Sequence, residues 1–161
     1  MIKAAILTIS DKGSRGERED KSGEVIKEKL REIKADVIAY EIIPDERTLI
    51  TERLKYLAES ANLVLTTGGT GVSLRDVTPE ATRDVIEKEL PGFSEAMRAE
   101  SFKITPRALG SRAISGIYKE TLIINLPGSP KAVAECLDVV LKSISHVLDL
   151  VKGVVEDCGR K

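Results

Sequence analysis

Residues 63–71 read Leu63-Val64-Leu65-Thr66-Thr67-Gly68-Gly69-Thr70-Gly71, an apolar run of strand length followed by a glycine-rich turn. Glycines in this density allow a positive φ or a close approach of the backbone to a ligand. Further on, Thr78-Pro79 predicts a helix start, with a hydroxyl N-cap and a proline at the first helical position. Strand-to-helix turns of this kind bind anions through backbone N–H groups, so phosphate is the first ligand to consider.

The glycine turn matches neither of two common nucleotide-binding motifs. No Gly-Lys-Ser/Thr follows the glycines, and the third glycine of a dinucleotide fingerprint would fall at position 74, where the chain has Leu74. Taken alone, the turn fits a plain tight turn as well as it fits a ligand loop. The rest of the chain therefore has to decide between the two.

Length and composition favour one soluble domain. The chain has 161 residues, 42% of them hydrophobic and 32% charged, which predicts a single domain at 1–153 and a tail at 154–161. The net charge of -1, without a basic run, argues against nucleic acid and anionic membranes as partners. We expect a cytoplasmic location, because the sequence shows no signal peptide and no segment that could span a bilayer. Cys136 and Cys158 suggest neither a disulfide framework nor a zinc site.

Predicted strands and helices alternate along the chain. The expected strands are 2–9, 36–43, 63–65, 112–117 and 121–126. The expected helices are 22–34, 45–60, 79–89, 94–101, 106–110 and 130–152, the last being either continuous or kinked. This order predicts an α/β fold: a three-layer, doubly wound, mainly parallel sheet with helices on both faces. A tight turn at 118–120 makes one strand antiparallel.

Polar or glycine-rich stretches follow four of the predicted strands. They are 10–23, 44–46, 67–76 and 125–131, and a predicted helix begins beside each. Ligands of open parallel sheets bind beyond the carboxyl ends of the strands, where these stretches would meet. Their coincidence favours a ligand site over a plain turn.

The predicted site combines acidic side chains with helix N-termini. The acidic residues are Asp11, Asp20, Asp45 and Asp76. Carboxylates repel phosphates unless a divalent cation lies between them, and Mg²⁺ takes one or two carboxylates plus phosphate oxygens. The combination predicts a Mg-nucleotide, with Arg75 and Lys131 neutralising charge during transfer. Asp45 has an equally ordinary structural interpretation, as a helix N-cap or first-turn anion.

The sequence offers no good covalent nucleophile. Cys136 falls in the middle of a predicted helix and is expected in the core, and His146 lies beside apolar helix positions without a triad around it. Chemistry alone therefore leaves phosphoryl transfer and nucleotidyl transfer open. A phosphatase or kinase acting on another small phosphorylated molecule remains an alternative.

Residues 66–71 and 75–82 together resemble the signature of the molybdenum-cofactor biosynthesis family, which includes bacterial MogA and MoaB and the G domains of Cnx1 and gephyrin. The resemblance covers residues 4–153, and the segment 75–79 is MogA-like. Further matching segments are Thr8-Ile9-Ser10-Asp11, Asp20-Lys21-Ser22-Gly23, Pro44-Asp45, Pro91-Gly92-Phe93, Ser111-Arg112 and Leu126-Pro127-Gly128-Ser129-Pro130.

The resemblance implies a molybdopterin adenylyltransferase. Such an enzyme converts ATP and molybdopterin, with Mg²⁺, into adenylyl-molybdopterin and pyrophosphate, and so prepares the dithiolene for metal insertion. It also implies a homotrimer, and a molybdenum-insertion protein as a further partner. The alternative is a pterin-binding carrier or scaffold of the same fold without catalysis. The presence of both Asp45 and Asp76 argues against that alternative.

The resemblance assigns the catalytic role, and the Mg²⁺, to Asp45 and Asp76. The residues that it implies for substrate and nucleotide binding are Ser10, Asp11, Asp20, Ser22, Thr67, Gly68, Gly69, Thr70, Gly71, Ser111, Pro127, Gly128 and Ser129.

Overall fold

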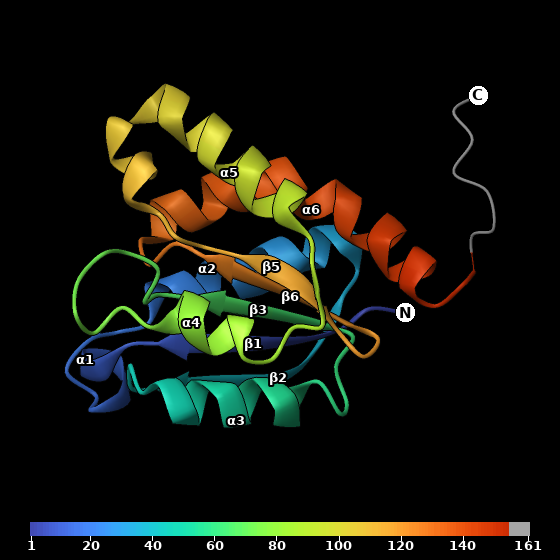
Figure 1. Cartoon of the computed structure of the whole chain (residues 1–161), viewed down its shortest axis with the longest axis horizontal. Helices are drawn as coiled ribbons and strands as arrows, with labels where there is room; N and C mark the ends of the chain where they lie inside the picture. Colours follow the sequence, from blue (N-terminus) through green and yellow to red (C-terminus); the bar gives the residue numbers. More distant parts are fainter. Residues whose placement is uncertain (155–161) are drawn as a thin grey trace.

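The computed structural model describes residues 1–154 and is built on a six-stranded sheet (Figure 1). The strands are β1 (Lys3–Ile9), β2 (Asp36–Ile43), β3 (Leu63–Thr67), β4 (Lys88–Glu89), β5 (Ser115–Tyr118) and β6 (Thr121–Leu126). Their order across the sheet is β2-β1-β3-β6-β5-β4. Strands β2, β1, β3 and β6 run parallel, whereas β5 is antiparallel to both of its neighbours. The predicted fold class is confirmed.

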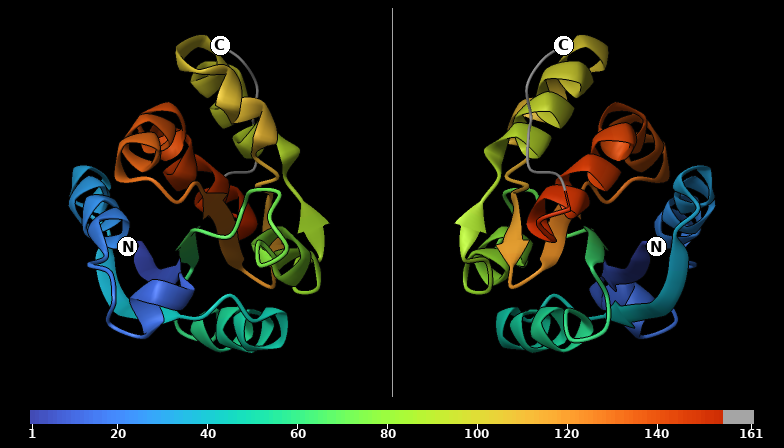
Figure 2. Two further views of the ribbon diagram at one scale, coloured as in Figure 1. Left: turned by 90° about the vertical axis from the view of Figure 1, so that its left-hand side faces the viewer. Right: turned by 90° about the vertical axis from the view of Figure 1, so that its right-hand side faces the viewer.

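Helices form a layer on each face of the sheet. They are α1 (Asp11–Ser14), α2 (Lys21–Leu30), α3 (Arg47–Leu57), α4 (Thr78–Arg83), α5 (Pro91–Ile104) and α6 (Pro130–Val151), with 3-10 turns η1 (Arg31–Ile33) and η2 (Pro106–Gly110). Figures 1 and 2 show α2, α5 and α6 on one face and α3 and α4 on the other. Among the described residues, no helix is both long and apolar enough to cross a membrane.

Strand β3 is buried on both faces, which explains the apolar run Leu63–Leu65 with which it begins. Leu63 and Leu65 pack into the core beneath α2 and α6, while Val64 packs into the core above α3. In the sheet, Thr67 at the end of β3 pairs with Thr8 of β1 and with Leu126 of β6. This register brings the ends of the three strands level, so the loops that follow them begin at one edge.

The observed helix bounds differ from the predicted ones at several helices, and the differences at α4 and α5 have clear causes. The helix expected at 79–89 ends at Arg83, because residues 88–89 extend to pair with β5 as a short edge strand. The helix expected from Ser94 begins at Pro91, a residue with the φ of a first helical position. Ser94 is buried, and its hydroxyl lies 3.3 Å from that of Ser115.

Two predicted caps are also wrong. Helix α2 is capped by Asp20, which accepts from the Gly23 N–H, and Ser22 instead donates to the Gly128 carbonyl oxygen at 2.6 Å. Likewise, Thr78 lies inside α4 and donates to the Gly68 carbonyl oxygen. In both cases a hydroxyl expected to cap its own helix joins two segments of the chain instead.

The C-terminal helix agrees better with prediction. Ser129 caps α6 by accepting from the Ala132 N–H, and the helix continues as one element to Val151 before Gly153, whose φ is 69°. Cys136 is buried in this helix, as expected. The predicted tail lies, except for Val154, outside the described residues, and so does Cys158.

Candidate active site

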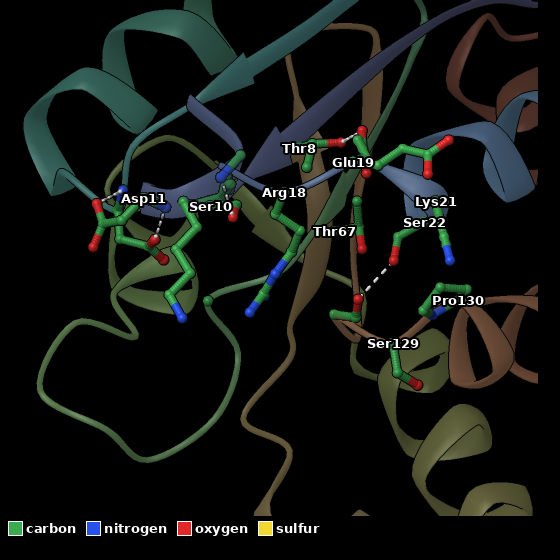
Figure 3. Close-up of a pocket in the computed structure, with 18 of the residues that line it drawn as sticks. Thr8, Ser10, Asp11, Arg18, Glu19, Lys21, Ser22, Thr67, Ser129 and Pro130 are labelled. Atoms are coloured by element: carbon green, nitrogen blue, oxygen red, sulfur yellow. Dashed lines mark hydrogen bonds between the residues drawn. The ribbon is translucent and has the colours of Figure 1, made fainter. Parts of the chain in front are cut away.

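A cleft of about 870 Å³ opens at the carboxyl ends of β1, β2, β3 and β6 (Figure 3). All four of the predicted loop stretches contribute to it. The predicted site residues that line it are Ser10, Asp11, Asp20, Ser22, Asp45, Thr67, Gly68, Gly69, Asp76, Gly128 and Ser129. The topology therefore brings together residues that are more than 100 positions apart, as in the Ser22–Gly128 hydrogen bond.

Four predicted residues do not line this cleft. Thr70 is buried, and Gly71 packs against the Asp76 carboxylate, where an added Cβ would lie 2.8 Å from Oδ2. Ser111 and Pro127 line a neighbouring cavity of about 350 Å³ between α5, η2 and α6. Ser129 lines both cavities, so the second one adjoins the first.

The glycine turn lines the cleft, and the backbone at two of its positions favours glycine strongly. Gly68 and Gly69 have φ values of 98° and 68°, in the left-handed region. A Cβ on Gly68 would lie 2.2 Å from the carbonyl oxygen of Ile9, and one on Gly69 would lie 2.3 Å from Oγ1 of Thr78. Thr78 fixes the turn, because its hydroxyl donates to the Gly68 carbonyl and its N–H to that of Gly69.

Asp11 and Asp45 hold each other in place across the cleft edge. The Asp11 N–H donates to Oδ2 of Asp45 at 2.9 Å, and the Asp45 N–H donates to Oδ1 of Asp11 at 3.0 Å. The N-cap of α3 is Glu46, so the alternative interpretation of Asp45 as that cap is wrong. This exchange of hydrogen bonds joins the loop after β1 to the loop after β2.

The two carboxyls differ in acidity. Hydrogen bonds from Arg75 hold the pKa of Asp11 below its ordinary value, against a smaller effect of desolvation. Burial raises the pKa of Asp45, and the negative charges of Asp11 and Asp76 add to that rise. A cation bound beside Asp45 would relieve both effects.

Asp76 lies on the loop between β3 and α4. Its Oδ2 accepts from the N–H of Ser73 at 2.9 Å and from the Ser73 hydroxyl at 2.6 Å. Its charge acts on Asp45, which places the two carboxylates in one electrostatic environment. The loop thus presents a second acid to the cleft wall that carries the first.

Asp20 lines the cleft, but its carboxylate is already engaged. Oδ1 caps α2 through Gly23, and Oδ2 accepts from the hydroxyls of Thr8, at 2.6 Å, and of Tyr40. Burial, followed by the hydrogen bond to Asp20, raises the pKa of Tyr40. Asp20 therefore holds the start of α2 against β1 and β2 at this wall of the cleft.

The donor set of Asp45 and Asp76 fits Mg²⁺. Both residues line the cleft, and within residues 1–154 Oδ1 of neither carboxylate accepts a hydrogen bond, so each keeps one oxygen that is not engaged by the protein. The described residues contain no group of three or more His, Cys, Asp or Glu side chains suited to a metal. One or two carboxylates are nevertheless enough for Mg²⁺ when phosphates supply the other ligands.

The cations of the cleft differ from those expected. Arg75 does not line the cleft; it pairs with Asp11 and Glu46, and Lys131 is exposed outside the cleft. The basic residues that line it are Lys12, Arg18 and Lys21, and Figure 3 shows Arg18 extending into it. The sequence did not single them out, because the stretch 10–23 holds as many acidic as basic residues.

Known proteins are similar to this chain in sequence and in fold. A family model described as "Probable molybdopterin binding domain" matches residues 5–146. The molybdopterin adenylyltransferase of Helicobacter pylori (strain J99) is 47% identical, over 94% of this chain and 89% of its own length. That of Escherichia coli K12 is 40% identical, over 91% and 77% respectively.

Solved structures agree. A molybdopterin biosynthesis enzyme MoaB from Thermus thermophilus has a TM-score of 0.89 and 46% identity, covering 95% of this chain and 98% of its own. A tungsten cofactor synthesizing protein MoaB from Pyrococcus furiosus has a TM-score of 0.87 and 36% identity, covering 94% and 98%. The chain therefore belongs to the MogA/MoaB family of molybdopterin-binding domains, as its sequence motifs predicted.

Proposed function

We propose that the chain is a molybdopterin adenylyltransferase, which transfers AMP from Mg-ATP to the phosphate of molybdopterin and releases pyrophosphate. Relatives that carry this name support the proposal. The observation that carries it is the meeting of Asp45, Asp76 and the glycine turn in one cleft. A triphosphate substrate needs this combination of acids for a cation and backbone N–H groups for phosphate.

The protein can bind phosphate without a P-loop. Helices α2 and α6 both begin at the cleft, where Ser22 and Pro130 line the wall, so the positive ends of two helix dipoles face it. Lys12, Arg18 and Lys21 add positive charge from the loop after β1. We expect these groups to bind the triphosphate, with the backbone of Gly68 and Gly69 close to it.

Asp45 and Asp76 would hold the Mg²⁺, which neutralises phosphate charge and orients phosphate oxygens when bound. An oxygen of the pterin phosphate then forms a bond to the α-phosphorus, while the bond from that phosphorus to the pyrophosphate oxygen breaks. The electron pair of the broken bond leaves with pyrophosphate. No side chain has to act as a nucleophile, so the protein contributes positioning and charge.

The test is formation of adenylyl-molybdopterin. The purified protein is incubated with ATP, Mg²⁺ and molybdopterin, and the adenylylated pterin and pyrophosphate are quantified by mass spectrometry and a coupled assay. We expect both products in equal amounts. Tight pterin binding without pyrophosphate would favour the carrier, and release of orthophosphate would favour a phosphatase or kinase.

We also infer one functional domain at 1–153, a cytoplasmic homotrimer, and transfer of the product to a metal-insertion protein. Exposed apolar side chains on α5 and η2 support an interface between copies: Phe102, Ile104 and Leu109 are 50%, 57% and 72% exposed. Sedimentation equilibrium tests the trimer, and a Leu109→Glu variant should dissociate it.

A further inference from the structure

Arg112 lies outside the cleft, yet it contacts both ends of the loop that carries Asp76. It belongs to the extended segment between η2 and β5, 36 positions from Asp76 in the sequence. Its backbone N–H donates to the Thr70 carbonyl at 2.8 Å. The segment that bears Arg112 is thereby fixed against the last residue before the loop.

The guanidinium divides its donors among three acceptors. Nε donates to the Gly71 carbonyl at 2.7 Å, Nη2 donates to the Asp76 carbonyl at 2.8 Å, and Nη1 pairs with Glu80 in α4. Gly71 and Asp76 are the first and last residues of the loop 71–76. One side chain therefore sets the distance between the two ends of the loop and their position relative to α4.

Little else ties this loop to the body of the protein. Val72 and Leu74 are 79% and 99% exposed, and Ser73 bonds to Asp76 within the loop itself. Arg75 reaches Asp11 and Glu46, but its own side chain is largely exposed. Arg75 bonds only to side chains of other loops, whereas Arg112 bonds to backbone carbonyls at both ends of the loop, so the backbone position of Asp76 depends on Arg112.

Glu80 depends on Arg112 in turn. Burial alone would raise its pKa, but the hydrogen bond and charge of Arg112 hold the pKa below its ordinary value. Oε2 of Glu80 is buried and has no hydrogen-bond partner among the described residues. Removal of the arginine would leave this carboxylate uncompensated, which ties the start of α4 to the same side chain.

We propose that Arg112 is a positioning residue for the adenylyl transfer, which sets Asp76 at the geometry that the cation and phosphates require. This inference rests on the proposed function. Arginine suits the role because its planar guanidinium carries five donors in a fixed arrangement, whereas lysine has three donors on a flexible stem. Lysine could keep the pair with Glu80 but could not satisfy both loop carbonyls at once.

The test compares Arg112→Lys with wild type in two measurements. Hydrogen exchange should become faster in the peptide that covers residues 71–77, while the unfolding temperature stays close to that of wild type. Turnover should fall by about 10- to 100-fold, the usual cost of displacing a reacting group by about 1 Å. KM for ATP should change far less, and more Mg²⁺ should be needed for half-maximal rate. If the lysine variant does not fold, the double variant Arg112→Gln/Glu80→Gln serves in its place, because it removes the arginine together with the carboxylate that needs its charge.

Arg47→Lys is the matched control. Arg47 makes a two-bond pair with Asp84, at 2.8 Å for each bond, at the far end of α4, so its loss should change neither loop exchange nor Mg²⁺ dependence. The inference would be overturned if a folded, active Arg112→Lys protein kept the wild-type hydrogen exchange in residues 71–77, the wild-type turnover or the wild-type Mg²⁺ dependence. A wild-type protein that makes no adenylylated product would instead refute the proposed function.

Discussion

The two acids of the cleft are held in different ways. Asp45 lies two residues beyond the end of β2, and its carboxylate and backbone exchange hydrogen bonds with Asp11, two residues beyond the end of β1. Asp76 lies nine residues beyond the end of β3, on a loop that is largely exposed. The first acid is positioned by the sheet itself, whereas the second is positioned by side chains from other parts of the chain.

Asp45 is therefore held more firmly than Asp76. Two neighbouring parallel strands determine where Asp45 can lie, and its half-buried setting raises its pKa. The loop of Asp76 can change position without disturbing the sheet, because its attachments are the bonds from Arg112 and Arg75.

The largest effects are expected from Asp45→Asn and Asp76→Asn. Each should lower turnover by about 10²–10³-fold, because each removes a charge that the cation requires. Asn keeps an oxygen that can accept the hydrogen bonds of Asp11 or Ser73, so both variants should remain folded. Steady-state pyrophosphate release measures turnover, and circular dichroism shows whether the variants remain folded. Full activity in either variant would remove that residue from the catalytic assignment.

Gly69→Ala tests the glycine turn, which contacts both Asp45 and the start of α4. The added Cβ would lie 2.3 Å from Oγ1 of Thr78 and 3.1 Å from Oδ1 of Asp45, at a φ of 68°. We expect a loss of about 1–3 kcal/mol of stability from the strained backbone. Turnover should fall by up to about 10²-fold as Asp45 and the start of α4 shift.

Chemical denaturation and pyrophosphate release measure these two effects. Gly92→Ala is the control for the glycine substitution, because no atom lies within 4 Å of its Cβ position. Equal behaviour of the two alanine variants would show that the turn tolerates a side chain.

The pH dependence of stability should have opposite signs for Asp45 and Asp11. The folded-state pKa of Asp45 is raised above its ordinary value of 3.8, so its charge opposes folding above that range and the penalty disappears as pH falls through the folded pKa. The pKa of Asp11 is lowered, so its charge favours folding at neutral pH, and this contribution is lost below its ordinary value of 3.8.

We therefore expect Asp45→Asn to stabilise the protein at pH 7, by an amount that shrinks toward pH 4, and Asp11→Asn to destabilise it. Denaturant midpoints of both variants and of wild type, measured across this pH range, test the two predicted changes in stability. Destabilisation by Asp45→Asn at pH 7 would show that its hydrogen bonds outweigh its charge.

The smallest effect is expected from Arg75→Ala. This substitution removes the exposed attachment of the Asp76 loop and leaves Arg112 in place. Stability should fall only slightly, because exposed ion pairs contribute little, and the effect should diminish in high salt. The pKa of Asp11, followed by carbon NMR of its carboxyl, should return toward its ordinary value. A loss of turnover as large as that of Arg112→Lys would show that both arginines position Asp76.

The sequence predicted some features of the site better than others. Asp45 and Asp76 were identified because a family signature surrounds each of them. Lys12, Arg18 and Lys21 were missed, because charged residues in a loop usually face solvent and spacing does not show which of them turn inward. Arg75 was expected to meet phosphate, but two carboxylates from other loops engage it instead.

By itself, the sequence determined the order of strands and helices except α1 and β4, the buried parallel sheet, the glycine turn and the capped start of α6. These features follow from local chemistry: apolar runs fill two-sided strands, glycine alone takes the turn, and Ser-Pro begins a helix. Tertiary structure alone decided that Asp11 holds Asp45, that Asp20 orders a wall, and that Arg112 spans the Asp76 loop. The bonds of Asp11 with Asp45 and of Arg112 with the loop join residues 34 or more positions apart, and such contacts depend on the register and packing of the whole sheet.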